Sequence, residues 1–288
     1  MSDRLVLQTA LGMHDHVAPL KDGRVKSDRV ELRFQEFEPL PNAFRHMVRG
    51  GDLDVSEIAI VTHLLACHYD RPFIGLAIPL WSRLPHTNLV STIDTDVSGP
   101  ADLEGRKVGV RAYAQTSGVW VRGILAADYG VDLDSITWVT MEDAHLPEYE
   151  DPSNCVRNAS AKGLRQLMLD GELAAIMGER VVDPRGIKTV IPDAKQTAHG
   201  WIEKTGIVPI NHTLTVKKKL LADHSWLAEE LMGMFEEARR IAVEDGAEPP
   251  PPYGFEQNRR SLALAFEYSA QQKITPRVYT AEELYHPI

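Results

Sequence analysis

The sequence has little cysteine, no long apolar run and no excess of basic residues, and each shortage excludes a class of protein. The two cysteines, Cys67 and Cys155, lie in unrelated surroundings, so no disulfide framework is implied. The longest nearly apolar runs, 58–66 and 73–81, are far too short to span a membrane. Acidic residues number 41 against 31 basic ones, which gives a net charge of −10. A nucleic-acid partner, which would require a basic face, is therefore not expected.

The motifs of several large enzyme classes are missing as well. The sequence contains no G-x-x-x-x-G-K-[ST] loop and no G-x-G-x-x-G after an expected strand. It also has no G-x-S-x-G elbow and no H-E-x-x-H helix. The first ten residues pair an acid with their one base around a very short apolar stretch, which is not typical of a secretory signal. We therefore expect a cytoplasmic protein without a cofactor.

The 288 residues suffice for two domains, and the pattern of short apolar runs and amphipathic stretches predicts an α/β protein. The expected strands are 4–11, 30–37, 53–55, 74–80, 87–92, 107–110, 136–140, 173–177 and 214–216. The expected helices are 42–49, 58–69, 117–128, 162–169, 225–245 and 258–270.

One pattern occurs twice. A helix followed by Gly51-Asp52-Leu53-Asp54-Val55 has a counterpart 120 residues later in a helix followed by Gly171-Glu172-Leu173-Ala174-Ala175. A helix that ends in glycine before a strand is common in itself, but the repeat also fits two similar α/β lobes. Ligands of open α/β sheets bind beyond the carboxyl ends of the strands. We therefore expect Ser56-Glu57 and Gly178-Glu179-Arg180 to face each other across a cleft.

Four short segments carry side chains suited to binding an organic acid or moving a proton. His14 and His16 follow the first expected strand, as surface residues or as residues facing a ligand. Ser82, Arg83 and His86 follow the strand 74–80; arginine matches a carboxylate and histidine titrates near neutral pH, although a polar surface turn has the same composition.

The other two segments precede a helix and a strand. Arg111–Thr116 leads into a helix at Ser117, where backbone N–H groups can bind an anion and where a hydroxyl can also act as an N-cap. His212 lies between Asn211 and Thr213, which is not a core pattern. His63 and Cys67 are four residues apart on an apolar helix and could share a metal, but no second pair follows, so core packing is the favoured interpretation.

Taken together, these segments resemble the 4,5-dihydroxyphthalate decarboxylase family over nearly the whole chain. The order and spacing of the matching pieces carry the resemblance, since each piece alone is weak. The pieces are Asp54-Val55-Ser56-Glu57; Ser82-Arg83 with His86; Val108-Gly109-Val110 with Tyr113 and Thr116; Val119-Trp120-Val121-Arg122-Gly123-Ile124-Leu125 before Tyr129-Gly130-Val131; Gly171-Glu172-Leu173; and Thr205-Gly206-Ile207 with Pro209-Ile210 and His212. The acidic loop 141–158 has no match in this pattern, and its role stays open.

The resemblance implies a two-lobed α/β fold of the type II periplasmic-binding-protein kind, with two crossover strands and a central cleft. Lobe 1 would comprise 1–90 plus 214–288, and lobe 2 would comprise 91–213. The implied activity is decarboxylation of a small aromatic carboxylate that bears a hydroxyl group, such as 4,5-dihydroxyphthalate. A homo-oligomer stays open.

Such a reaction requires a proton on the ring carbon that carries the carboxylate, after which CO2 leaves as aromaticity returns. We expect His212 or His86 to donate this proton while the other histidine acts on the phenol, and Glu57 to be a further acid or base. The expected substrate-binding residues are Ser82, Arg83, Arg111, Tyr113, Thr116, Ser117 and His14.

Two other classes of function fit the same sequence. The chain could be a solute-binding protein for an organic anion, against which the N-terminus argues. It could also be an enzyme like those of the futalosine menaquinone pathway, such as chorismate dehydratase. In a metal-assisted variant of the decarboxylase, His14, His16 and His86 are the candidate ligands.

Overall fold

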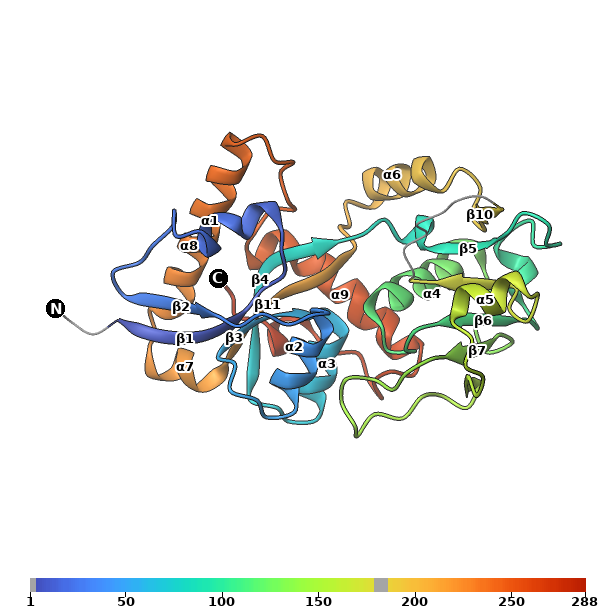
Figure 1. Ribbon diagram of the computed structural model, residues 1–288, viewed down its shortest axis with the longest axis horizontal. Helices are drawn as coiled ribbons and strands as arrows, with labels where there is room; N and C mark the ends of the chain where they lie inside the picture. Colours follow the sequence, from blue (N-terminus) through green and yellow to red (C-terminus); the bar gives the residue numbers. More distant parts are fainter. Residues whose placement is uncertain (1–3, 179–185) are drawn as a thin grey trace. The chain divides into compact units, whose positions relative to one another are not determined.

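The structure is a computed structural model that describes residues 4–178 and 186–288, and these residues form two compact units (Figure 1). Unit 1 contains the chain up to Ser82 together with Ile210–Ala263 and Tyr279–Ile288. Unit 2 contains Arg83–Pro209 and Leu264–Val278. Within the described ranges, no helix is both long enough and apolar enough to cross a membrane.

Unit 1 is built on a five-stranded sheet with the strand order β2-β1-β3-β11-β4. The strands are β1 (Leu5–Ala10), β2 (Val30–Phe34), β3 (Val55–Ala59), β4 (Phe73–Ser82) and β11 (Ile210–Lys217). β1 runs parallel to β2 and β3, whereas β11 runs antiparallel to both β3 and β4. The core of this unit joins apolar strand residues such as Leu7 and Leu214 to Leu231 and Phe235 of a long helix.

The helices of unit 1 are η1 (Asp15–Val17), α1 (Ala18–Lys21), α2 (Pro41–Val48), α3 (Ile60–His68), α7 (Lys218–Asp223), α8 (Leu227–Glu244), the first part of α9 (Phe255–Gln271) and α10 (Ala281–Leu284). The helix expected over 58–69 begins later, at Ile60, because β3 continues to Ala59. Every residue of β3 is buried, and the apolar run continues into α3. Hydrophobicity alone therefore gives no signal where the strand ends.

Unit 2 is built on a six-stranded sheet with the strand order β10-β5-β9-β6-β7-β8. The strands are β5 (Leu89–Thr92), β6 (Lys107–Val110), β7 (Thr137–Thr140), β8 (Cys155–Arg157), β9 (Ala175–Met177) and β10 (Ile187–Thr189). The helices are η2 (Pro85–Asn88), η3 (Pro100–Leu103), α4 (Thr116–Tyr129), α5 (Leu164–Leu169) and α6 (Ala194–Thr205), with the end of α9.

The two sheets have a common topology. β3 follows α2 and Gly51, lies parallel to β1 and lies antiparallel to β11. β9 follows α5 and Gly171, lies parallel to β6 and lies antiparallel to β5. The repeated helix–glycine–strand pattern in the sequence therefore marks equivalent strands of two similar α/β units. Glu179 and Arg180, which the sequence places beyond the second of these strands, lie outside the described residues.

The units divide at positions that differ from the expected lobe boundaries of 90/91 and 213/214. The divisions follow Ser82, at the end of β4, and precede Ile210, at the start of β11. Residues 264–278 belong to unit 2, where the ring of Tyr268 packs edge-on against Trp120 of α4 at 5.9 Å between centroids. The amphipathic pattern of α9 predicts a buried face but does not specify which unit buries it.

Candidate active site

Three of the residues singled out from the sequence meet at one edge of the unit 1 sheet. His14 follows β1, and Glu57 lies within β3. Because β1 and β3 are parallel, their carboxyl ends share this edge. β11 is antiparallel to β3, so its first residues reach the same edge, and His212 is the register partner of Ala59. The topology thus brings together side chains that are 43 and 155 residues apart in the sequence.

The carboxylate of Glu57 lies at the centre of this group and accepts hydrogen bonds from three nitrogens. His14 Nε2 is 3.0 Å from both carboxylate oxygens, and His212 Nδ1 is 2.6 Å from Oε1. The backbone N–H of Gly12 donates to Oε2 at 2.8 Å. The Glu57 side chain has no exposed surface, whereas His14 and His212 keep 20% and 13% of theirs. The arrangement therefore has a buried anion beneath two partly exposed imidazoles.

The state of the carboxylate fixes the roles of the ring nitrogens. Burial raises the pKa of Glu57, but the hydrogen bonds and charges of His14 and His212 outweigh burial and hold that pKa well below its ordinary value. An ionised carboxylate only accepts hydrogen bonds, so His14 Nε2 and His212 Nδ1 carry the donated protons. Among the described residues, neither His14 Nδ1 nor His212 Nε2 has another hydrogen-bond partner. These two nitrogens are the ones available to a ligand.

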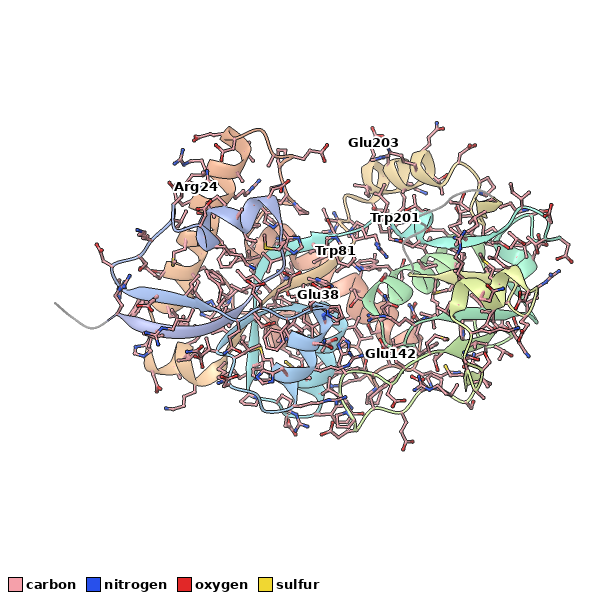
Figure 2. All side chains as sticks on the ribbon, viewed as in Figure 1. Arg24, Glu38, Trp81, Glu142, Trp201 and Glu203 are labelled. Carbon is pink, nitrogen blue, oxygen red and sulfur yellow. The ribbon has the colours of Figure 1, made fainter. Side chains whose placement is uncertain are left out.

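Aromatic rings surround His212 on the apolar side. The ring of Trp81, from the end of β4 (Figure 2), lies 4.7 Å from the His212 ring between centroids. Phe44 of α2 meets the same imidazole edge-on at 5.0 Å. Neither residue was singled out from the sequence, because single aromatic residues in apolar segments usually belong to the core. These contacts restrict the orientation of the imidazole.

On the other side, His16 stacks on His14 with 5.4 Å between ring centroids and 11° between ring planes. Burial, and secondarily the charge of His14, lowers the pKa of His16 to about 4. His16 is therefore neutral at neutral pH, and its buried Nε2 makes no hydrogen bond within the described structure.

Gly12 is a further residue that sequence reasoning missed. A Cβ atom at this position would lie 2.7 Å from His14 Nε2, 3.0 Å from Glu57 Oε2 and 3.1 Å from Leu40 Cδ2. The absence of a side chain lets the Gly12 backbone approach the carboxylate and donate its N–H. A glycine directly after an expected strand was the available signal, since such glycines often mark close backbone approaches.

His86 belongs to unit 2, where it lies in η2. Its side chain is buried beside the ring of Trp201 (Figure 2), at 5.9 Å between centroids, and burial lowers its pKa. His86 and His212 are thus parts of different units, and their pairing as acid and base stays a prediction.

Ser82 and Arg83 lie on either side of the division between the units. Ser82 ends β4 and pairs with Ile210 in the ladder of unit 1. The guanidinium of Arg83 donates from Nη1 to the carbonyl of Gly178 at 3.2 Å, within unit 2. That bond holds the arginine next to the end of β9.

The remaining expected ligand-binding residues lie around the start of α4. Arg111 forms an ion pair of 3.0 Å with Glu142, which belongs to the acidic loop 141–158. Tyr113 is buried, donates its hydroxyl to the carbonyl of Gln272 at 3.2 Å, and has its pKa raised by burial. Thr116 and Ser117 are the first residues of α4 and are buried.

Arg122, in the middle of α4, is fully buried, and its role was not foreseen. Its Nε donates to the side chain of Gln272 at 2.7 Å, and its Nη2 donates to the Tyr113 carbonyl at 2.6 Å. The guanidinium also lies over the Tyr113 ring, 3.9 Å from its centroid. These contacts join α4 to the segment after α9 inside unit 2 and give Arg122 a structural role.

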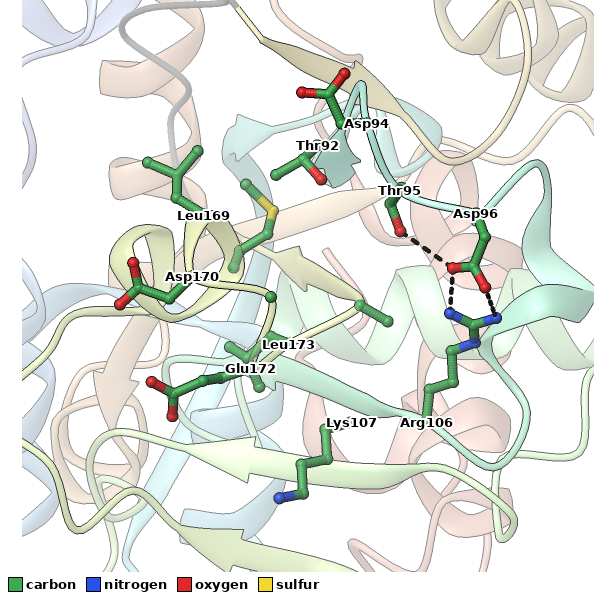
Figure 3. A pocket seen from close by; sticks show the side chains of 13 residues that line it. Thr92, Asp94, Thr95, Asp96, Arg106, Lys107, Leu169, Asp170, Glu172 and Leu173 are labelled. Atoms are coloured by element: carbon green, nitrogen blue, oxygen red, sulfur yellow. Dashed lines mark hydrogen bonds and ion pairs between the residues drawn. The ribbon is translucent and has the colours of Figure 1, made fainter.

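A pocket of about 480 Å³ is also present in unit 2 (Figure 3). Its charged lining consists of Asp94, Asp96, Asp170 and Glu172, with Arg106 and Lys107. Arg106 is held by Asp96 through two bonds of 2.5 and 2.7 Å. The excess of carboxylates disfavours an anionic aromatic ligand there.

Across residues 4–178 and 186–288, no group of three or more histidine, cysteine, aspartate or glutamate side chains has the geometry to hold a metal ion. Of the alternative ligand set expected from the sequence, His14 and His16 belong to unit 1 and His86 belongs to unit 2. His63 is fully buried, and its Nε2 donates to the carbonyl of Leu284 at 3.0 Å, which fits the core packing expected for it.

Comparison with solved structures defines the class of protein. The periplasmic aliphatic sulphonate binding protein SsuA from Escherichia coli aligns with a TM-score of 0.60 at 12% identity, over 100% of this chain and 94% of that one. The desulfurization enzyme DszB aligns with a TM-score of 0.57 at 13% identity, over 99% and 97%. The expected fold is confirmed: this is a two-unit α/β protein of the periplasmic-binding-protein type.

Two curated sequences narrow the class to a family, although no protein-family model matches the chain. A 4,5-dihydroxyphthalate decarboxylase from Comamonas testosteroni is 30% identical over 259 residues, which cover 83% of this chain and 76% of that protein. A 4,5-dihydroxyphthalate decarboxylase from Pseudomonas putida is 29% identical over 186 residues, covering 62% and 72%. The chain belongs to the 4,5-dihydroxyphthalate decarboxylase family.

Proposed function

We propose that the chain is a carboxy-lyase that releases CO2 from a hydroxylated aromatic carboxylic acid such as 4,5-dihydroxyphthalate, as a step in the breakdown of phthalates. Membership of the decarboxylase family supports the reaction class. The observation that carries the chemistry is the Glu57 carboxylate, which is buried and holds His212 with Nε2 available to a ligand.

His212 is the proton donor in this proposal. The short bond from Nδ1 to the Glu57 carboxylate fixes the imidazole so that Nε2, the nitrogen that carries the transferred proton in this proposal, points away from the carboxylate. Delivery of that proton to the ring carbon bearing the carboxylate allows the C–C bond to break. The phenol supplies electrons to that carbon, and the aromatic ring is restored as CO2 leaves.

Glu57 takes a different role from the one expected, because it is fully buried and already accepts three N–H groups. It acts as a positioning residue that orients the histidines rather than as an acid or base toward the substrate. The assignment of the carboxylate-binding residues stays a prediction. It concerns Ser82, Arg83, Arg111, Tyr113, Thr116 and Ser117.

The test of the function is CO2 release from 4,5-dihydroxyphthalate and a panel of hydroxybenzoates, with and without a chelator. In His212→Asn the amide can replace the Nδ1 donor to Glu57, but no proton is available at the position of Nε2. We expect kcat to fall by about 10²- to 10⁴-fold with a smaller change in KM. Unchanged turnover in this variant would refute the role of His212.

The matched control is His46→Gln. His46 also donates to a carboxylate, since its Nε2 is 2.7 Å from Asp52 Oδ1, but this pair is exposed. We expect its turnover to equal that of the unchanged chain. Tight binding of the acids by the unchanged chain without CO2 release would favour a solute-binding protein instead. Loss of water from a cyclic hydroxy acid without CO2 release would favour a dehydratase.

A cytoplasmic location is part of the same proposal. It is supported by the names of the curated relatives, which are those of enzymes rather than of binding proteins. Detection of the protein in the periplasmic fraction of its host would contradict this location.

A further inference from the structure

We propose that His14 is a second catalytic residue, which accepts the phenol proton, and that His14, Glu57 and His212 together hold one transferable proton. This inference rests on the proposed decarboxylase function. The sequence analysis expected His14 to bind the substrate and His86 to act with His212. In this proposal His14, which belongs to the same unit as His212, acts on the phenol in place of His86.

The first argument is geometric, because the two histidines engage the carboxylate through opposite ring nitrogens. His14 uses Nε2, at 3.0 Å from both oxygens of Glu57, and has Nδ1 available. His212 uses Nδ1, at 2.6 Å from Oε1, and has Nε2 available. Both rings are partly exposed, while the carboxylate between them is not. One carboxylate therefore orients two imidazoles, each with one available nitrogen.

The second argument is a count of charge. With both histidines neutral, the group carries the single negative charge of Glu57 in a buried position. One added proton makes the group neutral, which offsets the cost of burying the carboxylate. A second proton would leave a net positive charge on a partly buried group. In the state with one added proton, the site contains one acid and one base.

The ring of His16, in η1, stacks on His14, and the other charged groups that act on His16 are Asp15 of η1 and Arg239 of α8. His16 stays neutral near pH 7, because burial lowers its pKa to about 4. From α2 and β4, the side chains that contact His212 are the rings of Phe44 and Trp81. His14 and His212 are therefore the titratable side chains that hydrogen-bond to Glu57 within the described structure.

The proton balance of the reaction uses both available nitrogens. Neutral His14 takes the phenol proton at Nδ1, and the oxygen electron pair moves into the ring. The ring carbon bearing the carboxylate forms a C–H bond as the N–H bond at Nε2 of His212 breaks. The C–C bond to the carboxylate then breaks, CO2 leaves, and its electron pair restores the aromatic ring as a phenolate. The phenolate then takes back the proton from His14. Water reprotonates Nε2 of His212, which replaces the one proton that the reaction consumes.

The experiment compares pH profiles of kcat for the unchanged chain, His14→Gln and His212→Asn. The two amides can keep a donor toward Glu57, since the Gln amide can replace Nε2 and the Asn amide can replace Nδ1, which limits the disturbance to folding. The unchanged chain should give a bell-shaped profile, because only the singly protonated group is active. His46→Gln, which alters the exposed pair with Asp52, should keep the same profile.

The two site variants should each lose one limb of the bell. His14→Gln should lower kcat by about 10²-fold and lose the acid limb, because no base remains to be protonated. Its activity should still fall at high pH as His212 loses its proton. His212→Asn should lose the alkaline limb instead, and its activity should still fall at low pH as His14 is protonated. A bell of unchanged shape in His14→Gln, whether or not its height falls, would overturn the proposal and indicate a structural role.

A second measurement separates the base from the acid without relying on profile shape. A nitro-substituted hydroxybenzoate has its phenol ionised at neutral pH, so it does not need a base. With that substrate, the fold-loss in kcat caused by His14→Gln should approach one, whereas the fold-loss caused by His212→Asn should persist. Equal losses with both substrates would also overturn the proposal. If the unchanged chain releases no CO2 at all, the proposed function fails rather than the role of His14.

Discussion

Replacing Gly12 by alanine tests the site geometry without removing any functional group. The new Cβ would lie 2.7 Å from His14 Nε2, where ordinary contacts begin at 3.4 Å, so His14 has to retreat by about 0.7 Å. That movement stretches its 3.0 Å bond to Glu57 beyond hydrogen-bonding distance. A hydrogen bond to a charged group contributes about 1.5–3 kcal/mol. Loss of backbone freedom in the unfolded chain returns about 0.4–1 kcal/mol, so the net destabilisation should be about 1–2 kcal/mol.

The activity of Gly12→Ala should fall further than this stability change indicates. A displacement approaching 1 Å in a catalytic group costs up to about 10²-fold in rate, and we expect a loss in kcat between tenfold and 10²-fold. Urea unfolding and the CO2 assay measure the two effects. Gly233→Ala is the control, because an added Cβ in the middle of α8 meets nothing within 4 Å. It should raise stability by about 0.5–1 kcal/mol and leave turnover alone. If Gly12→Ala behaved like this control, the close approach around Glu57 would be wrong.

The remaining predictions concern folding. Burial lowers the pKa of His63 from 6.5 to about 4. Below pH 6.5 the imidazole is therefore protonated in the unfolded chain but stays neutral in the folded chain. The contribution of His63 to the free energy of unfolding should therefore fall by about 3 kcal/mol between pH 6.5 and 4. In His63→Gln the amide can keep the hydrogen bond to the Leu284 carbonyl, so the free energy of unfolding in urea should depend less on pH over that range. An unchanged profile would contradict this. Arg122→Met loses the bonds to Gln272 and the Tyr113 carbonyl and should lower the unfolding free energy by about 2–4 kcal/mol in urea; a change below about 1 kcal/mol would rule out its structural role.

The sequence predicts the members of the site better than it predicts the contacts that assemble it. Glu57 and His14 could be found because each stands after or within a short apolar strand, where ligands of α/β sheets bind. His212 was conspicuous because an Asn-His-Thr run does not look like a core segment. No local pattern, however, shows that β11 lies beside β3, since this pairing joins residues more than 150 positions apart. The shared carboxylate is a consequence of that pairing.

The residues missed by the sequence were those whose role depends on packing. Trp81 and Phe44 are unremarkable in apolar segments, and only the register of β11 against β4 brings Trp81 opposite His212. The register of β11 shifts on both sides of His212, an irregularity that no periodicity predicts. The residues next to Arg122 in the sequence of α4 are nearly all apolar. Its burial becomes intelligible once the end of α9 is known to pack in unit 2.

The net charge of −10 is compatible with the proposed anionic substrate, because the Glu57 carboxylate is buried beneath two imidazoles. A dianionic phthalate would be repelled by a bare carboxylate, but Glu57 is buried and surrounded by three N–H donors. With one shared proton, the group formed with His14 and His212 has no net charge. The form that supplies an acid and a base is therefore also the form that does not repel the substrate. In the proposed mechanism, a fully deprotonated group would lack the proton for the ring carbon and would also oppose binding. One protonation event would then control both affinity and chemistry.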